Sequence, residues 1–244
     1  MTYTDLNGVR THWERVGDGE PVVLLHGGGV GADSWFAQTP ALADAGFAVY
    51  LPERRGHGAT PDVLGPFTYP LMARDTAVFL DEVVGSSAHI VGWSDGALVG
   101  ALLAIERPDL VRRLVLIGQY YDRTGRDPDV HDEMSNWRDN PPQYLRDMYA
   151  ALSPDGAEHF PVVFGKILDL WDRDPGLPHE QMARITAPTL IVQGDRDAVR
   201  IDYSAALADA MPDARLAVLP GTHALPVESP ELVNTLLAQF LAVS

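Results

Sequence analysis

The chain has 244 residues, of which 46% are hydrophobic, so it is long enough and apolar enough to bury the core of one α/β domain. Its formal net charge of −16 at pH 7 argues against a broad surface for nucleic acid or another polyanion. The sequence has no cysteine, which excludes disulfides, thiolate metal ligands and a cysteine nucleophile. No basic segment followed by an apolar one opens the sequence, and no apolar run is long enough to span a membrane. We therefore expect a soluble, cytoplasmic protein.

The predicted elements begin with a hairpin and continue as alternating strands and helices. Two short strands, 3–6 and 10–14, flank the turn pair Asn7-Gly8. Further strands are expected at 21–25, 47–51, 88–91, 111–117, 189–194 and 216–219, and helices near 35–45, 69–84, 95–107 and 230–241. Ser229 and Pro230 supply an N-cap and a first-turn proline for the last helix. This alternation predicts a mostly parallel sheet covered by helices on both faces.

A serine between two glycines stands where one predicted strand gives way to a helix. The segment Gly92-Trp93-Ser94-Asp95-Gly96 has the pattern G-x-S-x-G, and in a strand–turn–helix context this makes Ser94 a candidate nucleophile. The glycines relieve backbone crowding at the sharp turn. The first amide of the following helix has no carbonyl partner, so the N–H of Asp95 is a candidate oxyanion donor.

Two later strands also end in polar groups. The strand at 189–194 leads into Asp195-Arg196-Asp197, and the strand at 216–219 is followed by His223. The chain order serine, aspartate, histidine is that of the α/β-hydrolases, and over nearly its whole length the chain resembles an α/β-hydrolase-fold serine hydrolase. The resemblance implies His223 as the base and Asp197 as the acid that orients it, with Asp195 and Asp122 as alternative acids.

Two more segments match this family. Residues 21–29 resemble the strand and H-G-x motif that supply the second oxyanion amide, expected at Gly28 with Gly29 adjacent. Residues 53–60 resemble the segment D-x-R-G-x-G-x-S, with Glu53 in place of the aspartate and Thr60 in place of the serine. The resemblance implies an α/β-hydrolase fold with a mostly parallel eight-stranded sheet, helices on both faces and a helical cap inserted after the sixth strand.

The strand–helix alternation fails between residues 122 and 186, where seven prolines and scattered apolar residues predict short helices. This stretch stands where the family inserts its cap, so we expect a core domain of residues 1–121 and 187–244 and a cap of residues 122–186. Most large side chains of the cap should pack within it, but together they predict a modest, mostly apolar pocket. The candidates for its lining are Trp137, Tyr144, Met148, Tyr149, Phe160, Phe164 and Trp171, with Gly29 and Trp93 from the core.

The side chain of Asp95 has two interpretations. A carboxylate beside the nucleophile would oppose anionic substrates and favour an amine-bearing ester. Alternatively, the carboxylate turns away from the pocket and bonds local backbone at the helix N-terminus, which is the arrangement its position favours. His57 is expected to be structural, and no H-E-x-x-H or comparable metal motif is present.

The sequence therefore predicts a hydrolase of a small carboxylic ester or lactone that works through an acyl-serine, without cofactor or metal. One alternative is a carbon–carbon bond hydrolase of ring-fission products. Residues 26–29 resemble the H-G-G-G-P-G of those enzymes, although Val30 replaces the proline. Another is a non-catalytic receptor that binds a ligand in the pocket. A dinucleotide site is a third, from G-x-G-x-x-A at 27–32, but it leaves Ser94 and His223 unexplained. The substrate and the oligomeric state remain open.

Overall fold

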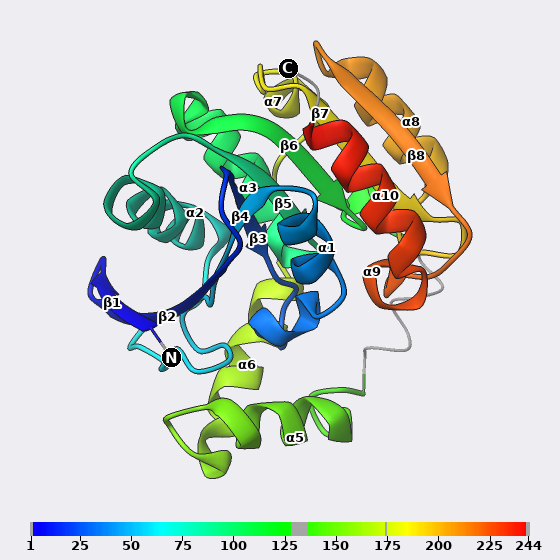
Figure 1. Cartoon of the computed structure of the whole chain (residues 1–244). Helices are drawn as coiled ribbons and strands as arrows, with labels where there is room; N and C mark the ends of the chain where they lie inside the picture. Colours follow the sequence, from blue (N-terminus) through cyan, green and yellow to red (C-terminus); the bar gives the residue numbers. More distant parts are fainter. Residues whose placement is uncertain (1, 128–135, 174, 243–244) are drawn as a thin grey trace.

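One twisted sheet organises the chain in the computed structural model, which describes residues 2–127, 136–173 and 175–242 (Figure 1). Within these residues eight strands pair in the order β1-β2-β4-β3-β5-β6-β7-β8. The strands β1 and β2 are antiparallel to their neighbours, and every other pair is parallel. The expected mostly parallel, eight-stranded sheet is therefore confirmed. Its strands are β1 (Thr2–Leu6), β2 (Val9–Val16), β3 (Glu20–Leu25), β4 (Phe47–Pro52), β5 (Ala88–Trp93), β6 (Val111–Ile117), β7 (Thr189–Gly194) and β8 (Ala214–Leu219).

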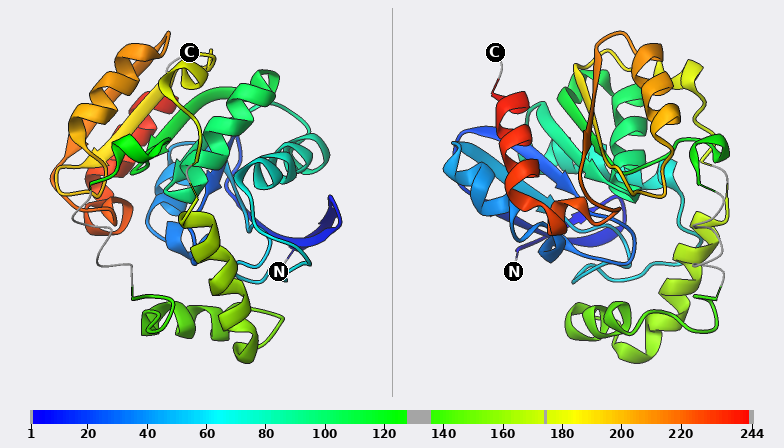
Figure 2. Two further views of the ribbon diagram at one scale, coloured as in Figure 1. Left: turned by 180° about the vertical axis from the view of Figure 1, so that it is seen from behind. Right: turned by 90° about the vertical axis from the view of Figure 1, so that its right-hand side faces the viewer.

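Helices cover both faces of this sheet (Figure 2). On one face lie α1 (Gln38–Asp44) and α10 (Pro230–Leu241), and on the other lie α2 (Tyr69–Phe79), α3 (Asp95–Glu106) and α8 (Ile201–Ala210). Successive side chains of a strand point to opposite faces, so β3 supplies Val22 and Leu24 to one apolar cluster and Val23 and Leu25 to the other. Two single-turn helices, α7 (His179–Met182) and α9 (Leu225–Glu228), complete this part of the fold.

Three local details differ from the sequence prediction. The helix expected at 35–45 is a 3₁₀ turn, η1 (Ala32–Trp35), followed by α1. The helix expected at 69–84 is α2 continued by a π-helical turn, η2 (Leu80–Val84), which ends at the left-handed Gly85. Ser229 stands at the N-cap position of α10, but its hydroxyl donates to the carbonyl of Pro220 at 3.4 Å and does not cap the helix.

The described part of residues 122–186 is built from short helices, as expected. They are η4 (Arg123–Gly125), α5 (Gln143–Leu152), η5 (Ala157–His159), α6 (Phe160–Trp171) and the single turn α7. Figure 2 shows α5 and α6 standing away from the sheet. Helix α6 is held to the loop after β4 by Asp62, whose carboxylate oxygens each lie 2.7 Å from Lys166 Nζ. Among the residues that the structure describes, no helix is long and apolar enough to cross a membrane.

Candidate active site

Ser94 occupies the turn between β5 and α3 in a backbone conformation that residues with a side chain rarely adopt. Its φ is 55° and its ψ is −120°. A Cβ at Gly92 would lie 2.3 Å from the carbonyl oxygen of Gly96, and one at Gly96 would lie 2.0 Å from that of Leu25. Both positions therefore require glycine. The N–H of Ser94 donates to the carbonyl of Ile117 at 2.9 Å, so the neighbouring strand β6 holds the turn in place.

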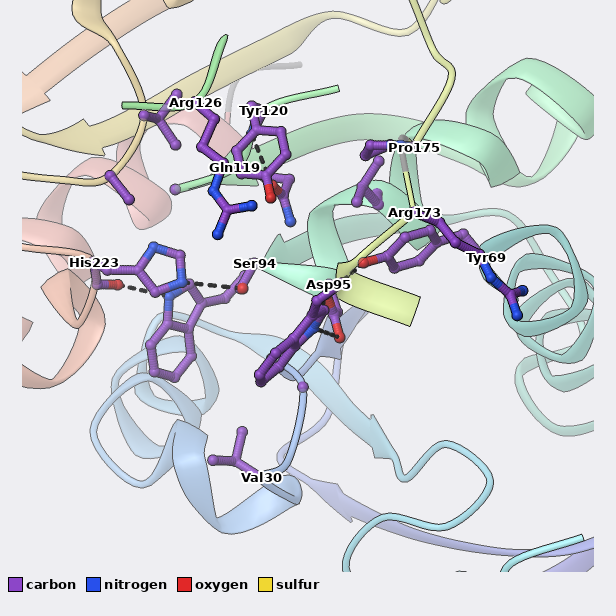
Figure 3. Close-up of a pocket in the computed structure, with 18 of the residues that line it drawn as sticks. Val30, Tyr69, Ser94, Asp95, Gln119, Tyr120, Arg126, Arg173, Pro175 and His223 are labelled. Atoms are coloured by element: carbon purple, nitrogen blue, oxygen red, sulfur yellow. Dashed lines mark hydrogen bonds between the residues drawn. The ribbon is translucent and has the colours of Figure 1, made fainter. Parts of the chain in front are cut away.

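The Ser94 hydroxyl begins a chain of hydrogen bonds. Its Oγ lies 3.0 Å from Nε2 of His223 (Figure 3), and Nδ1 of the same ring lies 3.0 Å from Oδ1 of Asp197. The three residues follow β5, β8 and β7, whose carboxyl ends meet at one edge of the sheet. The Asp197 side chain is buried, whereas 46% of the His223 side chain is exposed. The structure thus brings together the three residues that the sequence predicted as a triad.

The two alternative acids are engaged elsewhere. Asp195 accepts a hydrogen bond from the N–H of Gly221 at 2.9 Å. Asp122 accepts one from the N–H of Thr124 at 2.8 Å and so caps the turn η4. Of the three candidates, only Asp197 is hydrogen-bonded to His223.

The environment of His223 acts on its pKa in two directions. Partial burial lowers the pKa of the imidazole because it disfavours the charged form, but the hydrogen bond and the negative charge of Asp197 raise it, with a smaller contribution from Asp95. The net result is a pKa above the ordinary value of 6.5. Asp197 therefore stabilises the imidazolium that forms when His223 takes a proton from the serine.

Two backbone amides lie beside Ser94. Gly28, in the loop after β3, lines the same cavity as the serine. A Cβ at Gly28 would lie 2.3 Å from Oδ2 of Asp95 and 2.7 Å from the ring of Trp171, so this close packing requires glycine. The N–H of Asp95 is the first of α3, where amides have no partner within the helix. The role of these two amides as oxyanion donors stays a prediction.

A buried arginine holds the loop that contains Gly28 through hydrogen bonds to its backbone carbonyls. Arg54 donates to the carbonyl of His26 at 2.5 Å and to that of Gly27 at 2.9 Å. Burial lowers the pKa of Arg54 to about 10, and burial together with the Arg54 charge lowers that of His57 to about 3. His57 is buried away from the cavity that holds Ser94, and its Nδ1 donates to the carbonyl of Arg55 at 3.0 Å. This geometry agrees with the structural role expected for His57.

The expectation that the Asp95 carboxylate bonds local backbone is wrong. Its Oδ1 accepts a hydrogen bond from the Tyr69 hydroxyl at 2.8 Å, and the Trp171 indole N–H lies 3.0 Å from both oxygens. Both donors are uncharged and come from other helices, α2 and α6. The carboxylate, 2% exposed, therefore forms part of the pocket wall next to the nucleophile.

The cavity around Ser94 has a volume of about 310 Å³. Trp93, Trp137, Tyr144 and Trp171 line it, as the sequence predicted. Gly29, Met148 and Phe164 do not, and instead border a separate small space with Tyr149 and Phe160. The reason is that aromatic side chains of α5 and α6 pack against one another: the Tyr149 and Phe160 rings lie 5.6 Å apart, and the Phe160 and Phe164 rings stack at 5.1 Å.

Several residues that line the cavity were not predicted from the sequence. Gln119 and Tyr120 follow β6 directly, so the strand end was a usable signal for them. No local pattern marks the others, which come from helices and loops far apart in the chain: Tyr69, Leu98, Arg126, Leu145, Arg173, Pro175 and Val199. In the part of the chain that the structure describes, no group of three or more histidine or acidic side chains is arranged to hold a metal ion.

Comparison with known proteins assigns the chain to a family. The family described as the alpha/beta hydrolase fold matches residues 20–164. The “Putative carbamate hydrolase RutD” of Variovorax paradoxus is 32% identical over 95% of this chain and 96% of its own. The “Serine hydrolase BPHL” of Mus musculus is 26% identical over 97% of this chain and 84% of its own. The meta-cleavage product hydrolase CumD of Pseudomonas fluorescens superposes with a TM-score of 0.81 at 24% identity, over 98% of this chain and 97% of its own. The chain belongs to the alpha/beta hydrolase fold family.

Proposed function

We propose that the protein is a serine hydrolase that cleaves a small carboxylic ester or lactone through an acyl-serine intermediate. The observation that carries the proposal is the continuous hydrogen-bonded path from the Ser94 hydroxyl through His223 to Asp197, which opens into a cavity. A serine hydroxyl is a weak nucleophile at neutral pH. It becomes reactive when an adjacent histidine accepts its proton during the attack.

In the proposed reaction, the serine oxygen attacks the substrate carbonyl carbon while His223 Nε2 takes the hydroxyl proton. The negative charge that develops on the carbonyl oxygen is stabilised by the amides of Gly28 and Asp95, by about 3 kcal/mol for each donor. The intermediate then collapses, and His223 returns the proton to the leaving alcohol oxygen. A water molecule, deprotonated by the same imidazole, hydrolyses the acyl-serine and regenerates the Ser94 hydroxyl.

The cavity supports a small substrate. Its volume of about 310 Å³ is at the lower end of the range for ligand pockets. Leu98, Leu145 and the indole rings of Trp93, Trp137 and Trp171 contribute to its wall, which suits a short apolar acyl chain.

Other reactions on the same triad remain alternatives. The name of the 32% identical relative favours a carbamate as the bond that is cleaved. Cleavage of a carbon–carbon bond in a ring-fission product is the second alternative, and a receptor that binds its ligand without turnover is the third. A substrate panel of matched esters, lactones, carbamates and a ring-fission product separates the first two from ester hydrolysis, and covalent labelling separates them all from the receptor.

The decisive experiment is intact mass spectrometry after brief exposure to a fluorophosphonate, on the wild type and on Ser94→Ala. We expect a single adduct on the wild type and none on the variant, because only an activated serine reacts rapidly with such a probe. A folded wild-type protein that forms no adduct would contradict the proposal and favour the receptor.

A further inference from the structure

We infer that Arg126 and Gln119 form an anion-binding subsite, and that the substrate carries a carboxylate on the leaving-group side of the bond that is cleaved. The inference rests on the proposed serine hydrolase function and narrows its substrate class. It comes from two side chains that line the cavity and take no part in the triad or the oxyanion donors.

Arg126 directs a positive charge into the cavity. Figure 3 shows its guanidinium group pointing toward Ser94, next to Gln119 and away from the Asp95 carboxylate. Acidic residues outnumber basic ones by 34 to 18 in this chain, and many of its arginines pair with a carboxylate, as Arg55 does with Asp75 at 2.7 Å. Among the described residues, no carboxylate forms an ion pair with Arg126 and no acceptor bonds its guanidinium. Its charge is therefore available to a ligand.

The backbone around Arg126 is fixed. The N–H of Asp127 donates to the carbonyl of Ala198 at 2.8 Å, and the N–H of Arg200 donates to that of Gly125 at 2.9 Å. These bonds attach the loop after β6 to the loop that follows Asp197. The backbone of Arg126 therefore has a defined position relative to the triad. Binding an anion there would require little additional ordering of the backbone.

Gln119 and Tyr120 complete the surroundings of this charge. The Gln119 Oε1 accepts the N–H of Tyr120 at 2.8 Å, which leaves the amide NH₂ of the side chain as the group that can serve a ligand. The Arg126 guanidinium carbon lies 5.9 Å from the centre of the Tyr120 ring, a cation–π contact. A guanidinium and an amide NH₂ offer only donors, and the planar fork of the guanidinium matches a carboxylate.

The position of the subsite identifies the part of the substrate that it would bind. His223 must protonate the leaving oxygen, so the leaving group lies on the His223 side of Ser94. In Figure 3 the Arg126 guanidinium lies nearer to the His223 ring than to the Asp95 carboxylate. A carboxylate placed near Asp95 would be repelled by the buried negative charge, whereas one near Arg126 would be attracted. The two charges together favour one orientation of an anionic substrate.

The test uses two esters with the same acyl group and leaving groups of the same shape: the butyryl ester of glycolate and that of glycolamide. We expect the wild type to prefer the glycolate ester in kcat/KM. Arg126→Met should lower the ratio of kcat/KM for the charged over the neutral ester by about tenfold or more, since a charge-assisted hydrogen bond is lost. Arg126→Lys should restore part of the ratio.

Arg173→Met is the matched control. Arg173 also lines the cavity, but Figure 3 shows its guanidinium directed away from Ser94, and its removal changes the net charge equally. We expect less than a twofold change in the same ratio. Equal ratios in the wild type and Arg126→Met, or equal losses in both arginine variants, would overturn the subsite.

An Arg126-dependent preference for monomethyl succinate over methyl succinamate would overturn its leaving-group placement, because there the charge is on the acyl part.

A binding measurement keeps the subsite separate from the hydrolase proposal. If fluorophosphonate labels no serine and neither ester is cleaved, the proposed function has failed, and the subsite is then judged on calorimetry alone. We expect Ser94→Ala to bind phenylacetate more tightly than phenylacetamide, and the double variant with Arg126→Met to lose that difference. Equal binding of the two ligands by Ser94→Ala would overturn the inference even if ester hydrolysis is intact.

Discussion

The Trp171 indole nitrogen lies 3.0 Å from each carboxylate oxygen of Asp95. Trp171 ends helix α6, and Asp95 begins helix α3 immediately after the nucleophile. One hydrogen-bonded contact therefore connects the helices that stand away from the sheet to the turn that carries Ser94. It also keeps a carboxylate in the pocket wall rather than on local backbone.

Asp95→Asn tests what this carboxylate does, because the variant keeps the shape of the side chain and removes its charge. We expect the preference for an amine-bearing ester over a matched neutral ester to fall several-fold, because the attraction to an ammonium group is lost. The measurement is kcat/KM for both esters at pH 7.5. Trp171→Phe is the control that removes a hydrogen bond to Asp95 but leaves the charge. Equal wild-type rates on the two esters, unchanged in Asp95→Asn, would exclude a role in substrate selection.

Substitution of Ser94 should separate catalysis from stability. We expect Ser94→Ala to lower kcat by several orders of magnitude, and Ser94→Gly to do the same. The two variants should differ in stability, because position 94 has a φ of 55° that glycine adopts without strain. Ser94→Gly should therefore be more stable than Ser94→Ala by about 1 kcal/mol in urea unfolding. Equal stability of the two variants would contradict the assignment of strain to this turn.

The acid of the triad can be identified by comparing Asp197→Asn with Asp122→Asn. The first variant removes the partner of His223 Nδ1 and should lower kcat by about 10⁴-fold, since the imidazole loses its correct tautomer. The second removes only the cap of the turn η4 and should change kcat less than tenfold. Steady-state rates on one ester are sufficient. A larger loss of kcat in Asp122→Asn than in Asp197→Asn would identify Asp122, after the sixth strand, as the acid.

The pattern of strands predicted most of this site because each triad residue lies in the turn or loop that follows a strand. In a parallel sheet those ends converge, so the order of Ser94, Asp197 and His223 along the chain was enough to place them together. The partners of Asp95 were not predictable in the same way. Tyr69 and Trp171 are 26 and 76 residues away in the sequence, and only the packing of helices brings them to the carboxylate.

The large side chains between residues 122 and 186 show the same limit. Trp137 and Phe164 are both aromatic and lie in the same segment, yet one lines the cavity and the other packs against Phe160. Which of them faces the pocket depends on the rotation and tilt of each helix, and sequence composition does not specify either. Arg126 was missed because its loop is positioned by backbone hydrogen bonds that leave no pattern in the side chains.

The pH dependence of hydrolysis should reflect the raised pKa of His223. The neutral imidazole is the active base, so kcat/KM should fall as the pH is lowered through a pKa above 6.5. In Asp197→Asn, burial is no longer opposed by the carboxylate, and the acid limb of the profile should move to lower pH. Residual rates between pH 5 and 9 provide the measurement. A limb at the same pH in both proteins would show that another group controls the profile.

His57 should make the folded state sensitive to acid for a reason unrelated to catalysis. Burial lowers its pKa from 6.5 to about 3. Between these two values the unfolded chain binds a proton at this residue that the folded chain does not. The free energy of unfolding therefore decreases as the pH falls, by about 1.4 kcal/mol per pH unit for this one proton. His57→Gln removes the titrating group. In urea unfolding between pH 6 and 5, the slope of the free energy of unfolding against pH should therefore be smaller in the variant by about one proton.

Comparison at pH 7.5, where the imidazole is neutral in both states, gives the separate cost of lost packing against His26, whose ring centre lies 5.1 Å away. Parallel stability curves for the wild type and the variant would mean that the ring takes up its proton in the folded state, by opening to solvent or by rearrangement of the loop after β4.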